Sequence, residues 1–333
     1  MAICLESADL PKNKLKNMKK NIINWVCVDA QKIGTWKQAE ALAESWLDGN
    51  YHKKPINLST WCRWMPPKLF AILPKFLQML AVKGLKQPLP DLVIAAGRQA
   101  VLVAIAIRHK AKTVVLMNPG VPSHYFDVVI APVHDQLVGK NVILTQGAIH
   151  GIEPSQLVFP EHLRNYPGPK IGVLLGGNSI HGTYENSLAI DFANDLKRFC
   201  TNAGSLIITP SRRTPVDWLE VFEKNLNGTS YWIWDQKTEN PYPGLLSGVD
   251  AIVVCEDSIS MASEACVMGK PVFIYQTGVK KAKFKHFYQQ LFDKGYAQPF
   301  SVKAKINQDN FEAPTLKEVD RVVEQLRLIF NQS

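Results

Sequence analysis

The stretch from Asp250 to Tyr275 contains side chains whose types and spacing suit the binding of a nucleotide. Its pattern predicts an apolar strand, then a helix beginning near Ser258, then a second apolar strand. Ser258 and Ser260 would lie at the helix N-terminus, where free N–H groups and the helix dipole favour a diphosphate. Met261 and Glu264 follow within about one turn, and a carboxylate there could hold the two hydroxyls of a ribose. An ordinary βαβ unit with a capped helix would show the same pattern.

Two further polar loops of the second half follow predicted strands, one with Gly176, Gly177 and Asn178 and one with Ser211, Arg212 and Arg213. Glycine lets the backbone approach a phosphate closely, although a tight turn explains a glycine pair equally well. Planar guanidinium groups bind diphosphates bidentately and would neutralise a leaving nucleoside diphosphate. The carboxyl ends of parallel strands meet at one edge of a sheet, so these loops are expected to share a site.

In the first half, Gly97 and Arg98 follow a predicted strand and begin a helix, which is a second candidate anion site. His134 follows another strand and is the candidate general base for an acceptor hydroxyl. Its neighbour Asp135 is not expected to form a dyad with it, because adjacent residues of an extended chain point to opposite sides. A structural or merely exposed histidine is the alternative.

Strands and helices are predicted to alternate, which is typical of parallel sheets covered by helices on both faces. Strands are expected near residues 22–28, 56–59, 92–96, 113–117, 128–131, 142–145, 171–175, 206–209, 231–234, 251–255 and 272–275. Helices are expected over residues 35–47, 67–80, 98–108, 185–201, 216–226, 259–268, 282–294 and 316–330. This order predicts an α/β protein with two doubly wound, Rossmann-like domains facing each other across a cleft.

The domain limits follow from the proline- and glycine-rich stretch 158–169, which marks a boundary. We expect a flexible tail over residues 1–20, a first domain over 21–160, a second domain over 161–310 and a terminal helical segment over 311–333.

The net charge of +9 arises in the first half of the chain. Residues 1–170 contain 21 Lys and Arg against 11 Asp and Glu, whereas residues 171–333 contain 17 against 18. This asymmetry favours an anionic partner for the first half, such as a lipid or membrane surface or a phosphorylated acceptor; a solvated basic face would give the same count. Nucleic acid is not expected, because zinc-finger, RNA-binding and helix-turn-helix patterns are missing.

The cysteines indicate a reducing, cytoplasmic setting. Six are scattered along the chain without a C-x-x-C pair, so neither a disulfide framework nor a metal site is expected. Cys27 and Cys255 fall in apolar strands and are expected in the core. No apolar run reaches the length that crosses a bilayer, and the first residues do not read as a signal peptide.

Seven motifs form a recognisable set: PDLVIAAGR (90–98), FDVVIAPVHD (126–135), VILTQGA (142–148), GGN (176–178), TPSRRTP (209–215), NPYPGLL (240–246) and EDSISMASEACVMGKPV (256–272). Together they resemble the mitochondrial fission "elongated mitochondria" family and its bacterial relatives, which are similar to GT-B glycosyltransferases. The resemblance implies a GT-B-like fold with the terminal helix packed back on the first domain. It also implies a nucleotide-sugar donor on the second domain, with Glu264 on the ribose, and neither metal nor other cofactor.

The same resemblance assigns an acceptor side to the first domain, made of Gly34, Gln38, Gly97, Arg98 and Asp135. Asn240 would line the cleft beneath the nucleobase or sugar, or else cap a short helix.

One departure bears on catalysis. Members of the family usually carry a Gly-His-Glu-Asn-Gln-like loop after the first strand, whereas residues 34–38 of this chain read GTWKQ. If that histidine is catalytic in relatives, this protein uses another base or does not catalyse. The sequence therefore leaves two functions open: a metal-independent glycosyltransferase acting on an anionic or membrane-borne acceptor, and a non-catalytic adaptor that recruits a dynamin-like partner or binds a membrane surface.

Overall fold

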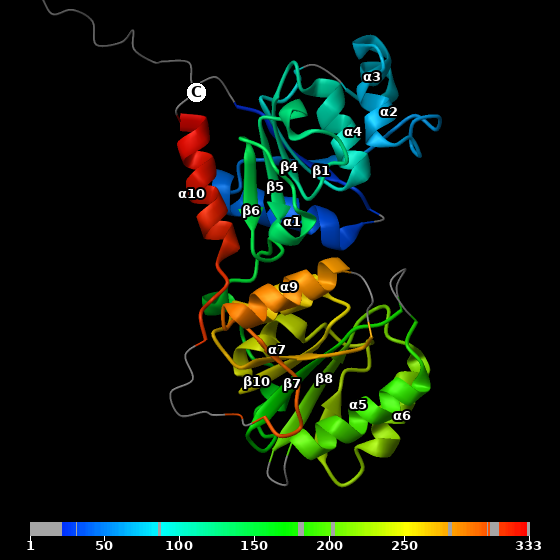
Figure 1. Cartoon of the computed structure of the whole chain (residues 1–333), viewed down its shortest axis with the longest axis vertical. Coiled ribbons are helices and arrows are strands. Elements are labelled where there is room, and N and C mark those ends of the chain that lie inside the picture. Colours follow the sequence, from blue (N-terminus) through cyan, green and yellow to red (C-terminus); the bar gives the residue numbers. More distant parts are fainter. Residues whose placement is uncertain are drawn as a thin grey trace, which may run out of the picture.

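The computed structural model describes residues 22–30, 32–85, 88–178, 183–200, 204–278, 282–304, 306 and 313–331. The tail expected over residues 1–20 lies outside this part of the chain. The described residues form two parallel sheets, each flanked by helices and one above the other in Figure 1.

The first sheet has six parallel strands in the order β2-β1-β3-β4-β5-β6. The strands are β1 (Asn24–Val28), β2 (His52–Pro55), β3 (Leu92–Ala96), β4 (Lys112–Leu116), β5 (Val128–Pro132) and β6 (Val142–Thr145). The accompanying helices are α1 (Ile33–Leu47), α2 (Pro67–Ala71), α3 (Lys75–Ala81) and α4 (Arg98–Ile107), with short 3-10 turns η1 (Ser123–Tyr125) and η2 (Val133–Asp135). Helices α2, α3 and α4 lie toward one face, and α1 toward the other.

The second sheet also has six parallel strands, in the order β12-β11-β10-β7-β8-β9. They are β7 (Lys170–Leu175), β8 (Ser205–Pro210), β9 (Ser230–Ile233), β10 (Ala251–Cys255), β11 (Val272–Tyr275) and β12 (Gln298–Pro299). Helices α5 (Asn186–Phe199) and α6 (Val216–Asn225) cover one face, and α7 (Tyr242–Gly248), α8 (Ile259–Cys266) and α9 (Ala282–Asp293) the other. The connection between the sheets contains the 3-10 turns η3 (Pro154–Gln156) and η4 (Glu161–Leu163).

Each sheet has a point where the chain reverses its direction of winding. In the first sheet this point lies between β1 and β3, and in the second between β7 and β10. Loops that leave neighbouring strands at such a point diverge to opposite faces and open a crevice, which is where doubly wound folds bind ligands. The predicted loops at Gly34, Gly97, Gly177 and Ser258 follow these four strands.

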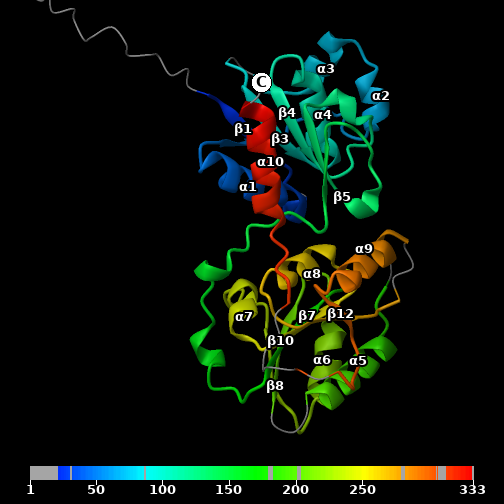
Figure 2. The same cartoon turned by 60° about the vertical axis from the view of Figure 1, so that its left-hand side comes forward.

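The last helix, α10 (Glu318–Asn331), joins the first sheet although it follows the second in sequence (Figure 2). Its Val322, Val323 and Leu326 are buried in one cluster with Ala39 and Leu42 of α1. The helix thereby covers the face of the first sheet on which α1 lies.

Two expectations about the first half were wrong. The strand expected at residues 56–59 instead occupies His52–Pro55, because β2 is an exposed edge strand that needs no apolar sequence. The single helix expected over 67–80 is divided into α2 and α3 at Pro74, whose missing N–H cannot continue the helical hydrogen bonds. The expected burial of Cys27 and Cys255 is confirmed. Among the described helices, none combines the length and apolar character required to cross a membrane.

Candidate functional site

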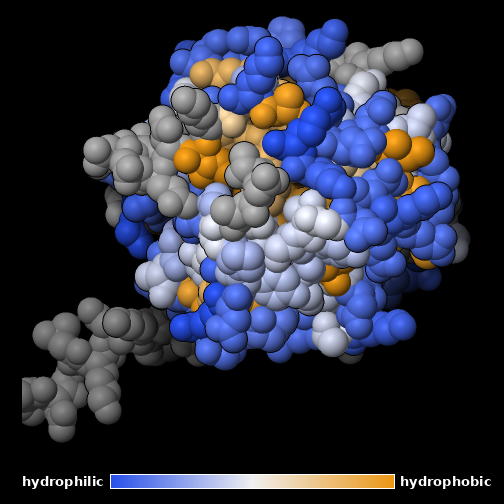
Figure 3. Space-filling model, turned by 90° about the horizontal axis from the view of Figure 1, so that it is seen from below, coloured by the Kyte–Doolittle hydropathy of each residue, from blue (hydrophilic) through white to orange (hydrophobic). Residues whose placement is uncertain are grey.

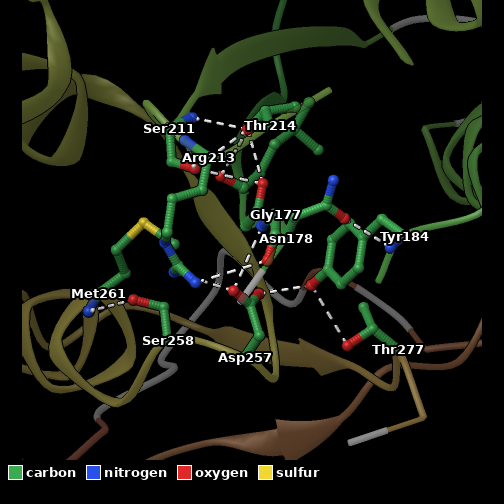
Figure 4. A network of polar contacts seen from close by, with 12 residues as sticks. Gly177, Asn178, Tyr184, Ser211, Arg213, Thr214, Asp257, Ser258, Met261 and Thr277 are labelled. Carbon is green, nitrogen blue, oxygen red and sulfur yellow. Dashed lines mark hydrogen bonds and ion pairs between the residues drawn. The ribbon is translucent and has the colours of Figure 1, made fainter. Parts of the chain in front are cut away.

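The loops at the winding reversal of the second sheet are held together by Asp257, which directly follows β10 (Figure 4). Its carboxylate accepts hydrogen bonds from the backbone N–H of Gly177 at 3.2 Å and from the hydroxyl of Tyr184. Arg213 completes the set with an ion pair from Nη2 to Oδ2 at 2.9 Å. Burial raises the pKa of Tyr184, so this hydroxyl stays protonated and remains a donor. The Asp257 side chain is only 2% exposed, so its charge is compensated within the protein.

The two glycines after β7 are required by packing between these loops. A Cβ on Gly176 would lie 1.6 Å from Asp257 Oδ1, and one on Gly177 would lie 2.0 Å from the carbonyl oxygen of Arg213. Asn178 donates its backbone N–H to that same carbonyl at 3.0 Å, and its side-chain oxygen accepts from the N–H of Tyr184 at 2.7 Å. These glycines were expected to allow the approach of a phosphate or to form a tight turn, and the close contacts observed are with neighbouring protein loops.

The two arginines of the loop after β8 differ in their surroundings. Arg213 points toward Asp257 and passes beside Met261 in Figure 4. Arg212 is exposed and has no hydrogen-bond or ion-pair partner within the described part of the chain. Ser211 shapes the loop, since its hydroxyl donates to the carbonyl of Gly176 at 3.2 Å. Arg212 therefore carries a charge that no described side chain compensates, whereas that of Arg213 is paired with Asp257.

The N-terminus of α8 adjoins this network. Ser258 is its N-cap, and Oγ accepts a hydrogen bond from the N–H of Met261 at 3.4 Å. Met261 thus contributes through its backbone. The first N–H groups of a helix have no partner within the helix, so this end retains donors for an anion.

A cavity of about 500 Å³ lies between the two domains and is lined in part by α8. From the second domain it is lined by Asn240, Ser260 and Glu264, and from the first by Gly34, Gln38 and His150, among others. Ligand cavities of small molecules and cofactors occupy about 300–1,000 Å³. Five predicted site residues therefore line one cavity: Gly34, Gln38, Asn240, Ser260 and Glu264. His150 also lines it but was not predicted as a site residue.

Glu264 is the buried carboxylate of this cavity. One of its oxygens, Oε2, accepts a hydrogen bond from the hydroxyl of Tyr242 at the start of α7. Burial raises the pKa of Glu264, while the hydrogen bond from Tyr242 and the charge of Lys37 oppose this shift. The other oxygen has no hydrogen-bond partner among the described residues, and Glu264 is one of the residues that line the cavity. Asn240 accepts from the N–H of Tyr242 at 3.0 Å and so fixes the same turn.

His150 lies in the loop that follows β6 and is 8% exposed. Neither of its ring nitrogens has a hydrogen-bond partner within the described residues. Burial lowers the pKa of His150 to about 4, although the charge of Glu318 opposes the shift. A neutral imidazole with one donor and one acceptor thus borders the cavity from the first domain.

The structure places His134 elsewhere. Its ring packs edge-on against Phe287 of α9, with 5.5 Å between the ring centroids, and it does not line the cavity. Its Nε2 lies 3.9 Å from Asp135, beyond hydrogen-bonding distance, and burial lowers the pKa of His134. The pair contributes to the contact between the domains.

Gly97 and Arg98 also lie outside the cavity. Gly97 has a φ of 86°, and a Cβ there would lie 3.0 Å from Thr35, so this glycine allows α1 and α4 to begin side by side. Arg98 donates to the carbonyl of Met65 at 3.3 Å and lies over the ring of Trp64. The Arg98 side chain thus makes its contacts within the first domain, and the anion site expected at this helix start stays a prediction.

Asp257, Tyr184 and His150 were not predicted as site residues. Asp257 had a detectable signal, because it follows a buried strand immediately before the helix cap. His150 had none, since its burial depends on segments distant in sequence.

Comparison with known proteins agrees with this architecture. The chain matches the family described as "Mitochondrial fission ELM1" over residues 33–329. It is 27% identical to protein RP120 of Rickettsia prowazekii (strain Madrid E), covering 91% of this chain and 97% of the relative. It is 30% identical to the mitochondrial fission protein ELM1 of Arabidopsis thaliana, covering 64% of this chain and 57% of that protein.

Solved structures show the same two-domain fold at low sequence identity. MurG of Acinetobacter baumannii has a TM-score of 0.55 at 12% identity, covering 92% of this chain and 99% of MurG. UDP-GlcNAc 2-epimerase of Neisseria meningitidis, bound to UDP-GlcNAc, has a TM-score of 0.51 at 13% identity, covering 94% of this chain and 100% of that one. The fold is thus GT-B-like, and with the match over residues 33–329 the chain belongs to the mitochondrial fission ELM1 family.

Proposed function

We propose that the cavity between the domains binds a nucleotide-sugar. The observation that carries the proposal is the cavity of about 500 Å³ between the domains, which Glu264 lines with one carboxylate oxygen that has no hydrogen-bond partner among the described residues. A carboxylate oxygen without a protein partner can accept a hydrogen bond from a hydroxyl group of a ligand in this cavity.

The parts of the ligand have distinct positions in this proposal. The ribose hydroxyls donate to Glu264 beside Ser260, and the diphosphate extends toward the N-terminus of α8 and Arg212. His150 borders the ligand from the first domain. The bound nucleotide-sugar of the Neisseria meningitidis epimerase, which shares the fold, supports the choice of ligand class.

Transfer of the sugar to an anionic or membrane-borne acceptor is the reaction that this arrangement would serve. The first domain carries the positive excess, which suits such an acceptor. The family match supports a second candidate, a non-catalytic adaptor, and the absence of His, Glu and Asn from residues 35–37 favours it.

A calorimetric and thermal-shift comparison of UDP, GDP, ADP and CMP tests the proposal. We expect one of them to stabilise the protein, by about 2.7 kcal/mol when its concentration is a hundred times its dissociation constant. Glu264→Gln should lower the affinity at least tenfold, because a neutral amide loses the charge-assisted hydrogen bond to ribose. Arg212→Ala should weaken UDP but leave uridine unchanged.

The matched control is Glu220→Gln, which alters an exposed carboxylate of α6 outside the cavity. If no nucleotide stabilises the protein, the adaptor function replaces the proposal. If Glu264→Gln lowers the stability of the ligand-free protein without changing the affinity, Glu264 has a structural role only.

A further inference from the structure

The helical hairpin α2–α3 and the segment before it carry an unusual concentration of exposed apolar side chains. Trp64 is 80%, Ile72 74% and Phe76 68% exposed. The exposed large apolar side chains of this surface are Trp61, Trp64, Leu69, Ile72, Phe76 and Leu80. Large apolar patches on a folded protein mark interaction sites, whereas singly scattered ones need no explanation. Together these six side chains form the hairpin surface.

The hairpin surface is the outer face of an element that is anchored firmly on its inner face. Phe70 and Ala81 are buried against the core of the first sheet. Gln78 is also buried, and its amide donates to the carbonyls of Phe70, Ala71 and Leu73 at 3.2, 3.1 and 2.9 Å. This amide joins the end of α2 to α3, so the hairpin is held in one conformation. Within α3, Phe76 and Leu80 are four positions apart and so lie on one face of the helix, while Leu69 and Ile72 are exposed in α2 and just after it.

The stretch of sequence that contains the hairpin surface carries only positive charges. Between Asp48 and Asp91 the sequence contains no Asp or Glu, but it contains seven Lys and Arg: Lys53, Lys54, Arg63, Lys68, Lys75, Lys83 and Lys86. Arg63, Lys68, Lys75 and Lys83 are exposed beside the apolar side chains. Long basic side chains can lie along an apolar surface and extend their charge to a layer of anionic groups.

We propose that the hairpin surface docks on an anionic lipid bilayer. Three observations favour this occupant. Exposed tryptophans prefer the boundary between headgroups and acyl chains, apolar helix faces insert to a shallow depth, and lysines at their edges bind anionic headgroups. A protein partner would need acidic groups around an apolar pocket to match this surface. An anionic bilayer offers both, because its charged headgroups lie above its apolar acyl chains.

The position of the hairpin in the molecule agrees with this role. Figures 1 and 2 show α2 and α3 projecting from the first domain at the end away from the second sheet. Figure 3 views the molecule from the second-domain end, where hydrophilic atoms predominate and apolar areas are small and separate. None of the residues of the hairpin surface lines the cavity between the domains. Docking is therefore independent of the proposed nucleotide site.

Sedimentation with vesicles of phosphatidylcholine alone, or with about a third phosphatidylglycerol, tests the proposal on the full chain. We expect binding to the anionic vesicles and a marked loss at high salt. Lys68→Gln with Lys75→Gln should lower partitioning about twenty-fivefold, since each basic residue near an anionic surface contributes about fivefold. Ile72→Ser with Phe76→Ser should lower it at least tenfold through the loss of apolar burial.

Matched controls use exposed residues of the second domain. Ile190→Ser with Val216→Ser removes two exposed apolar side chains, and Lys224→Gln with Lys237→Gln removes two exposed charges. Equal losses in test and control pairs, or equal binding to neutral and anionic vesicles, would overturn the proposal. Absence of vesicle binding would also overturn it and indicate a protein partner. The hairpin variants should also be stabilised by nucleotide as much as the wild type is. A loss of vesicle binding alone would then be distinguished from a failure of the proposed nucleotide site.

Insertion has a direct spectroscopic signature. Trp61 and Trp64 are exposed, whereas the other six tryptophans are buried or half-buried. Brominated lipids should therefore quench the fluorescence of the wild type. Trp61→Phe with Trp64→Phe should still bind but lose this quenching, because phenylalanine retains the apolar contact. Quenching that persists in this variant would show that another surface contacts the lipid.

Discussion

His150 is enclosed by the fold with both ring nitrogens unpartnered among the described residues. Its pKa is lowered to about 4 by burial, while the charge of Glu318 acts in the opposite direction. Because an unfolded histidine titrates near 6.5, the unfolded state binds a proton at pH 5 that the folded state does not. The neutral ring therefore supports stability above about pH 6.5, and this contribution is lost as the pH falls toward 4.

The first prediction from this titration concerns acid stability. Wild type should lose about 3 kcal/mol more of its free energy of unfolding than His150→Gln between pH 6.5 and pH 4. Urea unfolding at a series of pH values measures it. His286→Gln, at an exposed position of α9, is the control and should follow the wild type. A parallel pH profile for His150→Gln would mean that the ring is already protonated or solvated in the folded protein.

At the scale of elements, helix α7 positions Tyr242, whose hydroxyl donates a hydrogen bond to Glu264. Tyr242 is the first residue of this short helix, and the opposite end is capped by Lys270. Its ammonium donates to the carbonyls of Leu246 at 3.1 Å, Ser247 at 2.6 Å and Val249 at 2.6 Å. Burial lowers the pKa of Lys270, and the charge of Asp250 opposes the shift. A cation at a helix C-terminus satisfies carbonyls that lack partners within the helix.

Removal of this cap should loosen α7. Lys270→Met keeps the aliphatic chain but leaves the carbonyls without a donor, and we expect a loss of about 2 kcal/mol in the free energy of unfolding. Denaturant titration gives the value, and nucleotide affinity should fall in the same variant because Tyr242 is less well fixed. Lys294→Met changes an exposed lysine beyond α9 and should cost far less. Similar values for the two variants would show that Lys270 does not support α7.

At the scale of the whole molecule, the loop after β6 contacts α8 across the two domains. Ala148 donates its N–H to Ser263 Oγ at 3.0 Å, and Ser263 donates in turn to the carbonyl of Ile259 at 2.8 Å. The neighbouring Gly147 packs so closely that a Cβ would lie 2.6 Å from Ser263 Oγ and 2.8 Å from Leu316 Cδ2. The contact between Gly147 and Ser263 therefore leaves no space for a Cβ atom at position 147. Because this contact joins the two domains, it helps to set the distance between the walls of the cavity.

Gly147→Ala should therefore force the two domains apart locally. We expect a loss of about 1–3 kcal/mol in the free energy of unfolding, as for other overpacked sites. Gly151→Ala in the same loop is the matched control, since its Cβ would meet only Ala41 at 3.4 Å, an ordinary contact. Equal stability of the two variants in urea would contradict a tight interface at Gly147.

The sequence by itself determined the parallel α/β architecture and the loops at the strand ends. Alternation of strands and helices has a local cause, the spacing of apolar residues, and it placed Ser258 at the start of α8 and Glu264 within that helix. The edge strand β2 was misplaced because an exposed strand has no apolar signal. Pro74 by itself predicts a helix break, but apolar residues at helical spacing on both sides of it favoured one continuous helix over residues 67–80.

Only the tertiary structure decided which of those residues share a space. The pairing of Arg213 with Asp257 joins residues 44 positions apart, so the sequence could not distinguish this compensated cation from the free Arg212. Likewise the burial of His150 and the packing of His134 on Phe287 arise where segments of both domains meet. Charge compensation and desolvation depend on distances between remote segments, and a linear pattern of residue types does not contain those distances.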